Sequence, residues 1–151
     1  MAKKTKDLQY YEGVGRRKEA VARVRLYIGE PEKSIVVKGE KVKVGSIIVN
    51  GKPYETMFSL ASEQKRFLYP LEITNNIGRF VVSIVLAGGG KYGQLEAIVN
   101  GLARALNATD KEAYRPALKE QGLLTRDPRT RERRKVGKGG KARRQKQSPK
   151  R

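Results

Sequence analysis

The chain has 151 residues, of which 34 are Lys or Arg and 15 are Asp or Glu, so its formal net charge is +19. So large an excess of positive charge points to a polyanionic partner, such as a nucleic acid or an anionic membrane surface. Because the chain contains no cysteine and no histidine, it has no disulfide, thiol nucleophile or imidazole base, and we expect no catalytic residue, metal site or cofactor.

The first predicted element is a strand over residues 20–28. Apolar and other side chains alternate strictly there, which is typical of a strand with one buried face. The opposite face carries Arg23 and Arg25, which lie close together because they are two residues apart. Three further short strands are expected at 34–37, 41–44 and 46–49, separated by turns.

The second half of the body is predicted to be mostly helical. A helix over 60–69 is expected to end before Pro70, and a strand at 79–87, apolar on both faces, is expected in the centre of a sheet. Apolar residues then recur at helical spacing over 95–106. Asp110 is expected to cap a short helix, and Pro116 to stand in the first turn of another that ends at Gly122. This order predicts an α+β fold, with helices packed on a mostly antiparallel or mixed sheet.

The positive charge is concentrated at the C-terminal end. Residues 126–151 carry 13 basic and 2 acidic side chains, and their only aliphatic residues are Val136 and Ala142. Such a segment cannot bury enough apolar surface to offset the entropy lost on ordering. We therefore expect a globular body at 1–125 and a basic tail at 126–151 that is disordered when free.

Gly88 to Gly93 matches the G-x-G-x-x-G pattern of dinucleotide-binding proteins, between a predicted strand and a predicted helix. The pattern then fails, because that helix leads into more helix and not into a second parallel strand. Lys91 does not belong to the P-loop of nucleotide-binding proteins either, because no Gly-x-x-x-x-Gly precedes it and no Ser or Thr follows it. Two interpretations of these glycines stay open: close packing of strand and helix, and binding of an RNA phosphate at the start of the helix.

Arg16, Arg17 and Lys18 come directly before the strand that carries Arg23 and Arg25. Such a cluster matches phosphate oxygens well, although surface charge is more often simply solvated. In the tail, cations alternate with glycines, and this combination of charge and flexibility suits passage between RNA helices. The tail has no aromatic residue on which bases could stack.

Several segments, taken in order, carry a family resemblance. They are Tyr11–Lys18, 21–26, 49–53, 69–71, the glycine stretch through Gln94, 101–106, 115–119, 122–127 and a basic end at Lys150–Arg151. Together they resemble the family of small-subunit ribosomal protein nine, in its bacterial or organellar form. The resemblance covers nearly the whole chain.

The resemblance implies a structural protein of the small-subunit head and not an enzyme, with a left-handed βαβ crossover in its α+β fold. The implied partners are small-subunit ribosomal RNA, peptidyl-site tRNA and neighbouring ribosomal proteins, with no membrane. The candidate residues for ribosomal RNA are Arg16, Arg17, Lys18, Arg23, Arg25, Lys91, Gln94, Arg126, Arg129, Arg131, Arg133, Arg134, Lys135, Lys138, Lys141, Arg143 and Arg144. Lys150 and Arg151 are the candidates for the anticodon stem-loop of the tRNA. The basic residues among them would act by electrostatic positioning of a phosphate backbone.

The chain departs from the family pattern in two places. It ends Gln147-Ser148-Pro149-Lys150-Arg151, where the family usually has an aromatic residue and no proline, and Pro149 stiffens the tip. Residues 29–46 are longer than the usual connection and add four lysines, which we interpret as an extended hairpin on the surface.

Three other functions were weighed against a ribosomal role. A free-standing RNA or DNA chaperone would share the basic composition, and a nucleotide-dependent enzyme is disfavoured by the incomplete glycine motif. A membrane-surface protein would need an apolar helical face, which the tail lacks. The N-terminus has no apolar signal region and no run approaches the roughly 18 apolar residues of a membrane span. We therefore expect a ribosome-bound protein of the cytoplasm, or of an organellar matrix or stroma.

Overall fold

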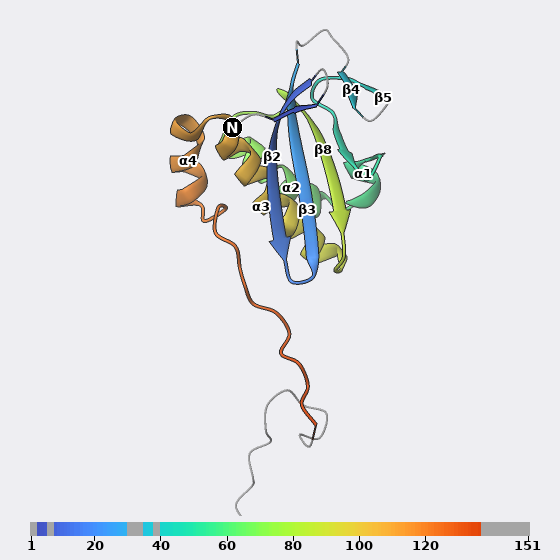
Figure 1. Cartoon of the computed structure of the whole chain (residues 1–151), viewed down its shortest axis with the longest axis vertical. Helices are drawn as coiled ribbons and strands as arrows, with labels where there is room; N and C mark the ends of the chain where they lie inside the picture. The colour runs from blue at the N-terminus through green and yellow to red at the C-terminus, as the bar shows by residue number, and fades with distance from the viewer. Residues whose placement is uncertain (1–2, 6–7, 30–34, 38–39, 137–151) are drawn as a thin grey trace, which may run out of the picture.

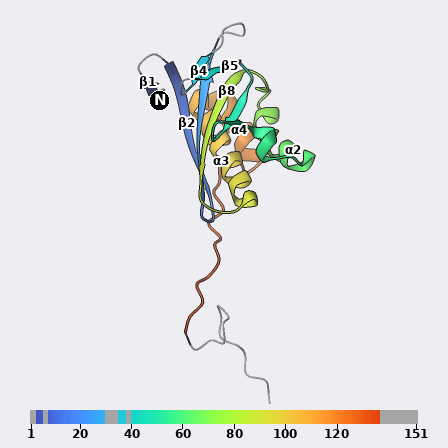
Figure 2. The same ribbon diagram turned by 90° about the vertical axis from the view of Figure 1, so that its right-hand side faces the viewer.

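The computed structural model of the protein describes residues 3–5, 8–29, 35–37 and 40–136. The body has two layers, a six-stranded sheet and a layer of helices on one of its faces (Figures 1 and 2). The strand order is β1-β2-β3-β8-β6-β7, and β4 and β5 form a separate two-stranded sheet. The elements are β1 (Lys3–Thr5), β2 (Leu8–Arg17), β3 (Ala20–Ile28), β4 (Ile35–Val37), β5 (Glu40–Val42), β6 (Ile47–Val49), β7 (Lys52–Pro53), α1 (Tyr54–Met57), α2 (Ala61–Ile73), β8 (Phe80–Ala87), α3 (Lys91–Thr109) and α4 (Lys111–Glu120).

The sheet is mixed, which confirms the predicted α+β class. β2, β3 and β8 are antiparallel neighbours, and β6 pairs with β8 in parallel. Between β6 and β8 the chain passes through α1 and α2 on the helical side of the sheet. In Figure 1 the helices lie behind the sheet, β8 runs downward, and β6 lies on the side of β8 away from β3. The connection from β6 through the helices to the parallel strand β8 is therefore left-handed, as the family resemblance implies.

The core lies between the sheet and α3. The apolar stripe predicted from Leu95 to Leu106 is buried against Val24, Leu26 and Ile84, the inward-facing side chains of β3 and β8. Phe58 and Phe67 close one side, with ring centroids 5.8 Å apart. The strand at 80–87 is central and buried on both faces, as predicted.

Glycines allow α3 to lie directly on β2. A Cβ at Gly13 would meet the carbonyl oxygen of Gly101 and come within 2.5 Å of the amide nitrogen of Ala105. A Cβ at Gly15 would overlap the backbone of α3 in the same way. Beside this contact, Nη1 of Arg104 donates a hydrogen bond of 2.7 Å to the carbonyl oxygen of Val14. The contact fixes β2, and with it the basic residues at its end, relative to α3.

The other face of the sheet is only partly open. At one end Tyr10 and Tyr27 pack with Val42 and Val81 in a second apolar cluster. Tyr27 is therefore buried, although it belongs to the face opposite the main core. Toward the β2–β3 turn this face is open, and Arg23 is exposed there.

Two helix boundaries predicted from prolines are wrong. α2 continues through Pro70 to Ile73, because Phe67, Pro70 and Leu71 are all buried and their packing outweighs the lost backbone hydrogen bond. A single helix, α4, contains Pro116. The residue whose carbonyl oxygen loses its helical donor there is Glu112, which is exposed. Capping by Asp110 is confirmed, since its side chain accepts a hydrogen bond of 3.0 Å from the amide of Ala113.

The segment after α4 begins with a well-defined turn. Gly122 has φ +68°, and the amides of Gly122 and Leu123 each donate a 3.0 Å hydrogen bond back to Lys119 and Leu118 respectively. This pattern is a Schellman motif, and it confirms the predicted end of the helix at Gly122. Leu123 is buried, the chain then passes the end of β2, and beyond Arg129 it runs away from the body (Figure 1).

Candidate nucleic-acid interface

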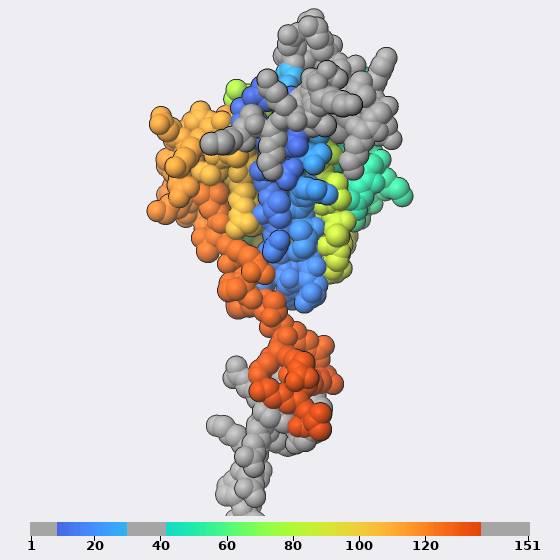
Figure 3. All heavy atoms as spheres, in the orientation of Figure 1, coloured from blue at the N-terminus to red at the C-terminus, as the bar shows by residue number. Residues whose placement is uncertain are grey.

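Basic residues from three segments meet at one end of the body. These segments are the β2–β3 turn with Arg16, Arg17 and Lys18, the start of α3 with Lys91, and residues 126–135 of the chain after α4. We call this set the cationic end. Figure 3 shows the segment after α4 (orange) lying against the body at the foot of β2 and β3 (blue).

The β2–β3 connection presents a cation at its tip. Arg17 pairs with Ala20, so the turn consists of Lys18 and Glu19 alone. Lys18 has φ +50°, a left-handed conformation that glycine adopts freely and that lysine adopts at a cost. Among the described residues, the only other non-glycine residues with positive φ are Asn50 and Asn75, a residue type that tolerates it. The fold therefore keeps an exposed lysine at a position where glycine would fit better.

The neighbouring arginines differ in how accessible they are. Arg16 is exposed, and its side chain has no hydrogen bond or ion pair with any residue that the structure describes. The side chain of Arg17 is only 14% exposed. Its Nη1 donates to the carbonyl oxygens of Arg129 at 2.9 Å and Asp127 at 3.4 Å, and its Nη2 lies 3.2 Å from the Asp127 carboxylate. The sequence groups these residues together, but the structure gives them different surroundings.

Arg23 and Arg25 differ in the same way. Arg23 is exposed on the open part of the sheet. Arg25 is half-buried, donates from Nε to Glu12 at 3.1 Å, and lies 4.7 Å from the ring centroid of Tyr10. Burial alone would lower the pKa of the Arg25 guanidinium, but hydrogen bonds to Tyr27 and Glu12 outweigh it and raise that pKa.

The glycine loop before α3, at residues 88–90, favours the first of the two interpretations given above, close packing of strand and helix. Gly88 and Gly89 have φ +68° and +66°, and a Cβ on either would collide with the backbone of Glu19 or Ala20. Gln94 donates from Nε2 to the carbonyl oxygen of Gly88 at 3.1 Å and so holds the loop closed. Since α3 is followed by α4 and not by a parallel strand, the dinucleotide pattern is incomplete in the structure too.

Lys91, in the first turn of α3, also has an internal partner. Its Nζ lies 2.8 Å from Oε2 of Glu63 on α2. About half of the Lys91 side chain stays exposed, so the ion pair reduces its positive charge without hiding it.

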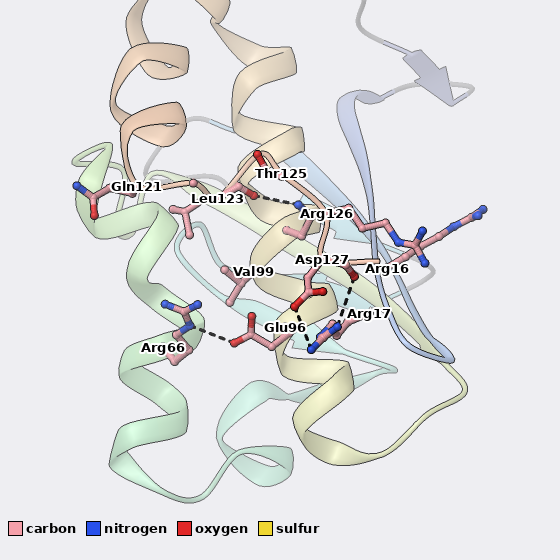
Figure 4. Close-up of a pocket in the computed structure, with 12 residues that line it drawn as sticks. Arg16, Arg17, Arg66, Glu96, Val99, Gln121, Leu123, Thr125, Arg126 and Asp127 are labelled. Carbon is pink, nitrogen blue, oxygen red and sulfur yellow. Dashed lines mark hydrogen bonds and ion pairs between the residues drawn. The ribbon is translucent and has the colours of Figure 1, made fainter. Parts of the chain in front are cut away.

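A small pocket of about 100 Å³ lies between α2, α3 and the chain that follows α4 (Figure 4). Arg66 pairs with Glu96 across one side at 3.2 Å, and Arg17 pairs with Asp127 across the other. Asn100, which is buried, donates from Nδ2 to the carbonyl oxygen of Leu123 at 2.9 Å. The sequence analysis missed Arg66, Asn100 and Asp127, because only the fold brings them beside the basic residues.

The exposed cations continue along the segment after α4. Arg126, Arg129, Arg131, Arg133, Arg134 and Lys135 are all exposed. The candidates Lys138, Lys141, Arg143, Arg144, Lys150 and Arg151, and the departure at Pro149, lie outside the described residues.

Other kinds of site find no support in the part of the chain that the structure describes. No helix among those residues is long and apolar enough to cross a membrane. Within the same ranges, no three Asp or Glu side chains are grouped so that they could hold a metal ion. What the site offers is exposed guanidinium and ammonium groups around a closed glycine loop. Such groups suit the binding of a polyanion through its charge.

Comparison with known proteins identifies the family. Residues 15–151 match the family described as ribosomal protein S9/S16. The chain is 45% identical over 128 residues to the small ribosomal subunit protein uS9 of Dehalococcoides mccartyi, which covers 85% of this chain and 86% of that protein. It is 43% identical over 136 residues to the protein of the same name from Maridesulfovibrio salexigens, covering 90% and 92%.

The chain belongs to the ribosomal protein S9/S16 family. It is thus a structural protein of the small ribosomal subunit, a role that implies binding of ribosomal RNA.

Proposed function

We propose that the cationic end, together with Arg23 and Arg25, holds the RNA of the small-subunit head, and that the basic tail carries positive charge onward to the peptidyl-site tRNA. The RNA contacts of the body would come from Arg16, Lys18, Arg23, Arg25, Lys91 and Gln94, and those of the tail from Arg126 to Arg144. Arg17 lies among these residues, but its guanidinium is engaged by residues 127–129. Lys150 and Arg151 would meet the anticodon stem-loop.

The observation that carries the RNA proposal is the meeting of the β2–β3 turn and the start of the tail. Arg17 and Asp127 are 110 residues apart in sequence yet form an ion pair of 3.2 Å. The exposed cations on both sides of this pair therefore lie on one surface, where a single phosphate backbone can follow them. Arg16 and Lys18 are the first residues to test, because both are exposed.

The salt dependence of RNA binding tests this surface directly. Each phosphate contact contributes roughly one unit to the slope of log affinity against log salt concentration. Arg16→Gln combined with Lys18→Gln should therefore reduce that slope by about 2 for a head-domain RNA fragment. The matched control is Lys52→Gln with Lys111→Gln, which removes the same charge from exposed positions on β7 and α4. Equal slopes for the two double variants would contradict the proposal.

The tRNA contact rests on the family resemblance and on the distribution of charge. Deleting residues 149–151 should leave folding and incorporation into the subunit intact, because the core between the sheet and the helices is built from residues of the body between Tyr11 and Leu124. The same deletion should weaken binding of an anticodon stem-loop to the peptidyl site of isolated subunits. If incorporation fell instead, the tip would serve assembly and not tRNA binding.

The wider setting follows from the same role. In the subunit head the body would also contact neighbouring ribosomal proteins, and the protein would reside with ribosomes in the cytoplasm or an organellar compartment. The sheet edge at β7, whose two residues are exposed, is one surface that such a neighbour would meet.

A further inference from the structure

Arg17 directs its guanidinium at the chain itself, although it lies in the most basic stretch of the body. Its donors reach two carbonyl oxygens and one carboxylate of residues 127–129, and its side chain is 86% buried. Figure 4 shows Arg17 and Asp127 facing each other while Arg16 points away. Three of the five N–H donors of its guanidinium are therefore used within the chain, which leaves at most two for a phosphate.

Asp127 is the second half of this arrangement. It is one of two acidic residues in a tail with 13 basic ones. Its carboxylate accepts from the amide of Arg129 at 2.9 Å, from Nε of Arg129 at 3.0 Å and from Nη2 at 2.6 Å. Hydrogen bonds from the Arg129 side chain and amide, with the charges of Arg129 and Arg17, hold the pKa of Asp127 well below its usual range. Residues 127–129, with Pro128 between, therefore form a closed turn fastened to the end of β2.

The chain between α4 and this turn is also held. Leu123 is buried in the core, its carbonyl oxygen accepts from Asn100, and the amide of Thr125 donates to Gly122 at 3.2 Å. The path of the chain is thus determined as far as Arg129. Beyond that residue, 22 residues remain, enough to reach roughly 70 Å when extended.

We infer that Arg17 is a positioning residue for the tail: with Asp127 it fixes the point and the direction in which the tail leaves the body. The consequence for function rests on the tail contacts proposed above. A tail that starts from a fixed direction concentrates its cations near their target, whereas a free pivot spreads them over a larger volume and lowers their effective concentration. We call the contacts of Arg17 with residues 127–129 the clamp. Without the clamp, the point about which the tail pivots would move back from Arg129 to the residues just after Leu123.

The clamp also explains how a carboxylate is tolerated beside an RNA-binding surface. An unpaired Asp127 would repel phosphates and weaken the neighbouring contacts. Paired with two arginines, it leaves a net charge of +1 on the three side chains. Arg17 therefore acts through Asp127, while Arg16 stays available to the partner.

The direction of the tail can be measured on the full-length free protein. Because the chain has no cysteine, spin labels can be placed at Lys65→Cys on α2 and Thr130→Cys just beyond the clamp, both exposed positions. Double electron–electron resonance should give one narrow distance distribution for the otherwise unchanged protein. Arg17→Gln should broaden it, and Arg17→Lys should restore it in part, since lysine keeps the ion pair but cannot reach both carbonyl oxygens.

The control variant is Arg16→Gln, which removes the same charge from the adjacent residue and should leave the distribution narrow. Asp127→Asn provides a second test that cannot disturb the core, and it should broaden the distribution as well. An unchanged distribution in both Arg17→Gln and Asp127→Asn, or an equal broadening in Arg16→Gln, would overturn the assignment.

A second measurement separates this inference from the proposed function. In subunits reconstituted with Arg17→Gln, the affinity for an anticodon stem-loop should fall about three- to tenfold. The salt slope for head-domain RNA should stay unchanged with Arg17→Gln and decrease with Arg16→Gln. A loss of salt slope in Arg17→Gln equal to that in Arg16→Gln would make Arg17 a direct RNA contact and refute the positioning role. A released tail in the resonance experiment with unaltered stem-loop affinity would support the positioning role and contradict the proposed tRNA contact.

Discussion

Gly13 is a position in the body where a single added methyl group should have a large effect. A Cβ there would meet the carbonyl oxygen of Gly101 and lie 2.5 Å from the amide nitrogen of Ala105, where ordinary contact begins at 3.4 Å. The interface between β2 and α3 would have to open by at least about 0.9 Å at this point. Neither side can yield locally, because the atoms involved belong to the backbone of a buried helix and of a strand paired with β3.

The cost of that separation follows from the behaviour of tightly packed cores. Overpacking a core by one methyl group costs about 1–3 kcal/mol, and a collision with backbone belongs at the upper end of that range. For a body of this size, 1 kcal/mol corresponds to a shift in the melting temperature of roughly 4 °C. Gly13→Ala should therefore lower the melting temperature by roughly 12 °C. The underlying loss of about 3 kcal/mol is a large fraction of the free energy of unfolding of a typical domain.

Thermal unfolding of the full chain, followed by circular dichroism, measures this directly. The control is Gly93→Ala, which adds the same methyl group to the buried first part of α3, where its nearest neighbours would be 3.5 and 3.6 Å away. Replacing glycine in a helix by alanine stabilises it by about 0.5–1 kcal/mol, so this variant should melt a few degrees higher. If Gly13→Ala melted within 2 °C or so of the unchanged protein, α3 could not lie on β2 as described.

Three further substitutions test the site. Arg23→Gln should reduce the salt slope of RNA binding by about 1. Arg25→Gln should reduce the slope less and destabilise the body more, because Arg25 is half-buried and bonded to Glu12. Equal reductions of the slope would show that the difference in exposure does not decide which arginine meets RNA. Lys18→Gly should raise the free energy of unfolding by about 1 kcal/mol and weaken RNA binding, and a variant that gained stability without losing affinity would show that the strained lysine is not a contact. Asn100→Ala should lower the free energy of unfolding by about 1–3 kcal/mol in chemical denaturation, because the buried carbonyl oxygen of Leu123 loses its partner.

The sequence predicted those elements whose buried faces are apolar. β3 and α3 each place large aliphatic side chains toward one core, at spacings of two and of three to four residues, and these patterns can be recognised without knowing the neighbour. β2 was missed because its inward positions near the end are Gly13 and Gly15. Glycine carries no sign of burial in a sequence. Only the backbone of α3, at closer range than any Cβ allows, shows why these two positions are glycines.

The prolines led to helix ends being predicted where the helices continue. A helix usually ends before proline, but α2 and α4 both continue through one. At Pro70 the decisive factor is burial of the proline and its neighbours in the core. At Pro116 the residue that loses its helical partner, Glu112, is exposed. Both circumstances depend on tertiary position, which local preference does not contain.

Charge counts located the site but not the roles within it. Arg16 and Arg17 are adjacent and chemically identical in the sequence, yet one is exposed and the other is held by residues more than a hundred positions away. Arg23 and Arg25 share one strand face, yet the position of Glu12 on the neighbouring strand engages only the second. The register of the sheet and the path of the tail determine these differences, and neither can be read from composition.

Acidic residues, few as they are, decide which cations of the body remain available. Glu12 engages Arg25, Glu63 engages Lys91, Glu96 engages Arg66 and Asp127 engages Arg17. Each pair links two different elements, so these cations lose part of their attraction for phosphate and help to hold the sheet, the helices and the tail together. Ion pairs near a protein surface add little stability individually. Their main effect is on which RNA candidates of the body stay available: Arg16, Lys18 and Arg23 are exposed and have no ion pair with a described residue. The salt slope of the body should therefore follow these three residues and not its total of basic residues.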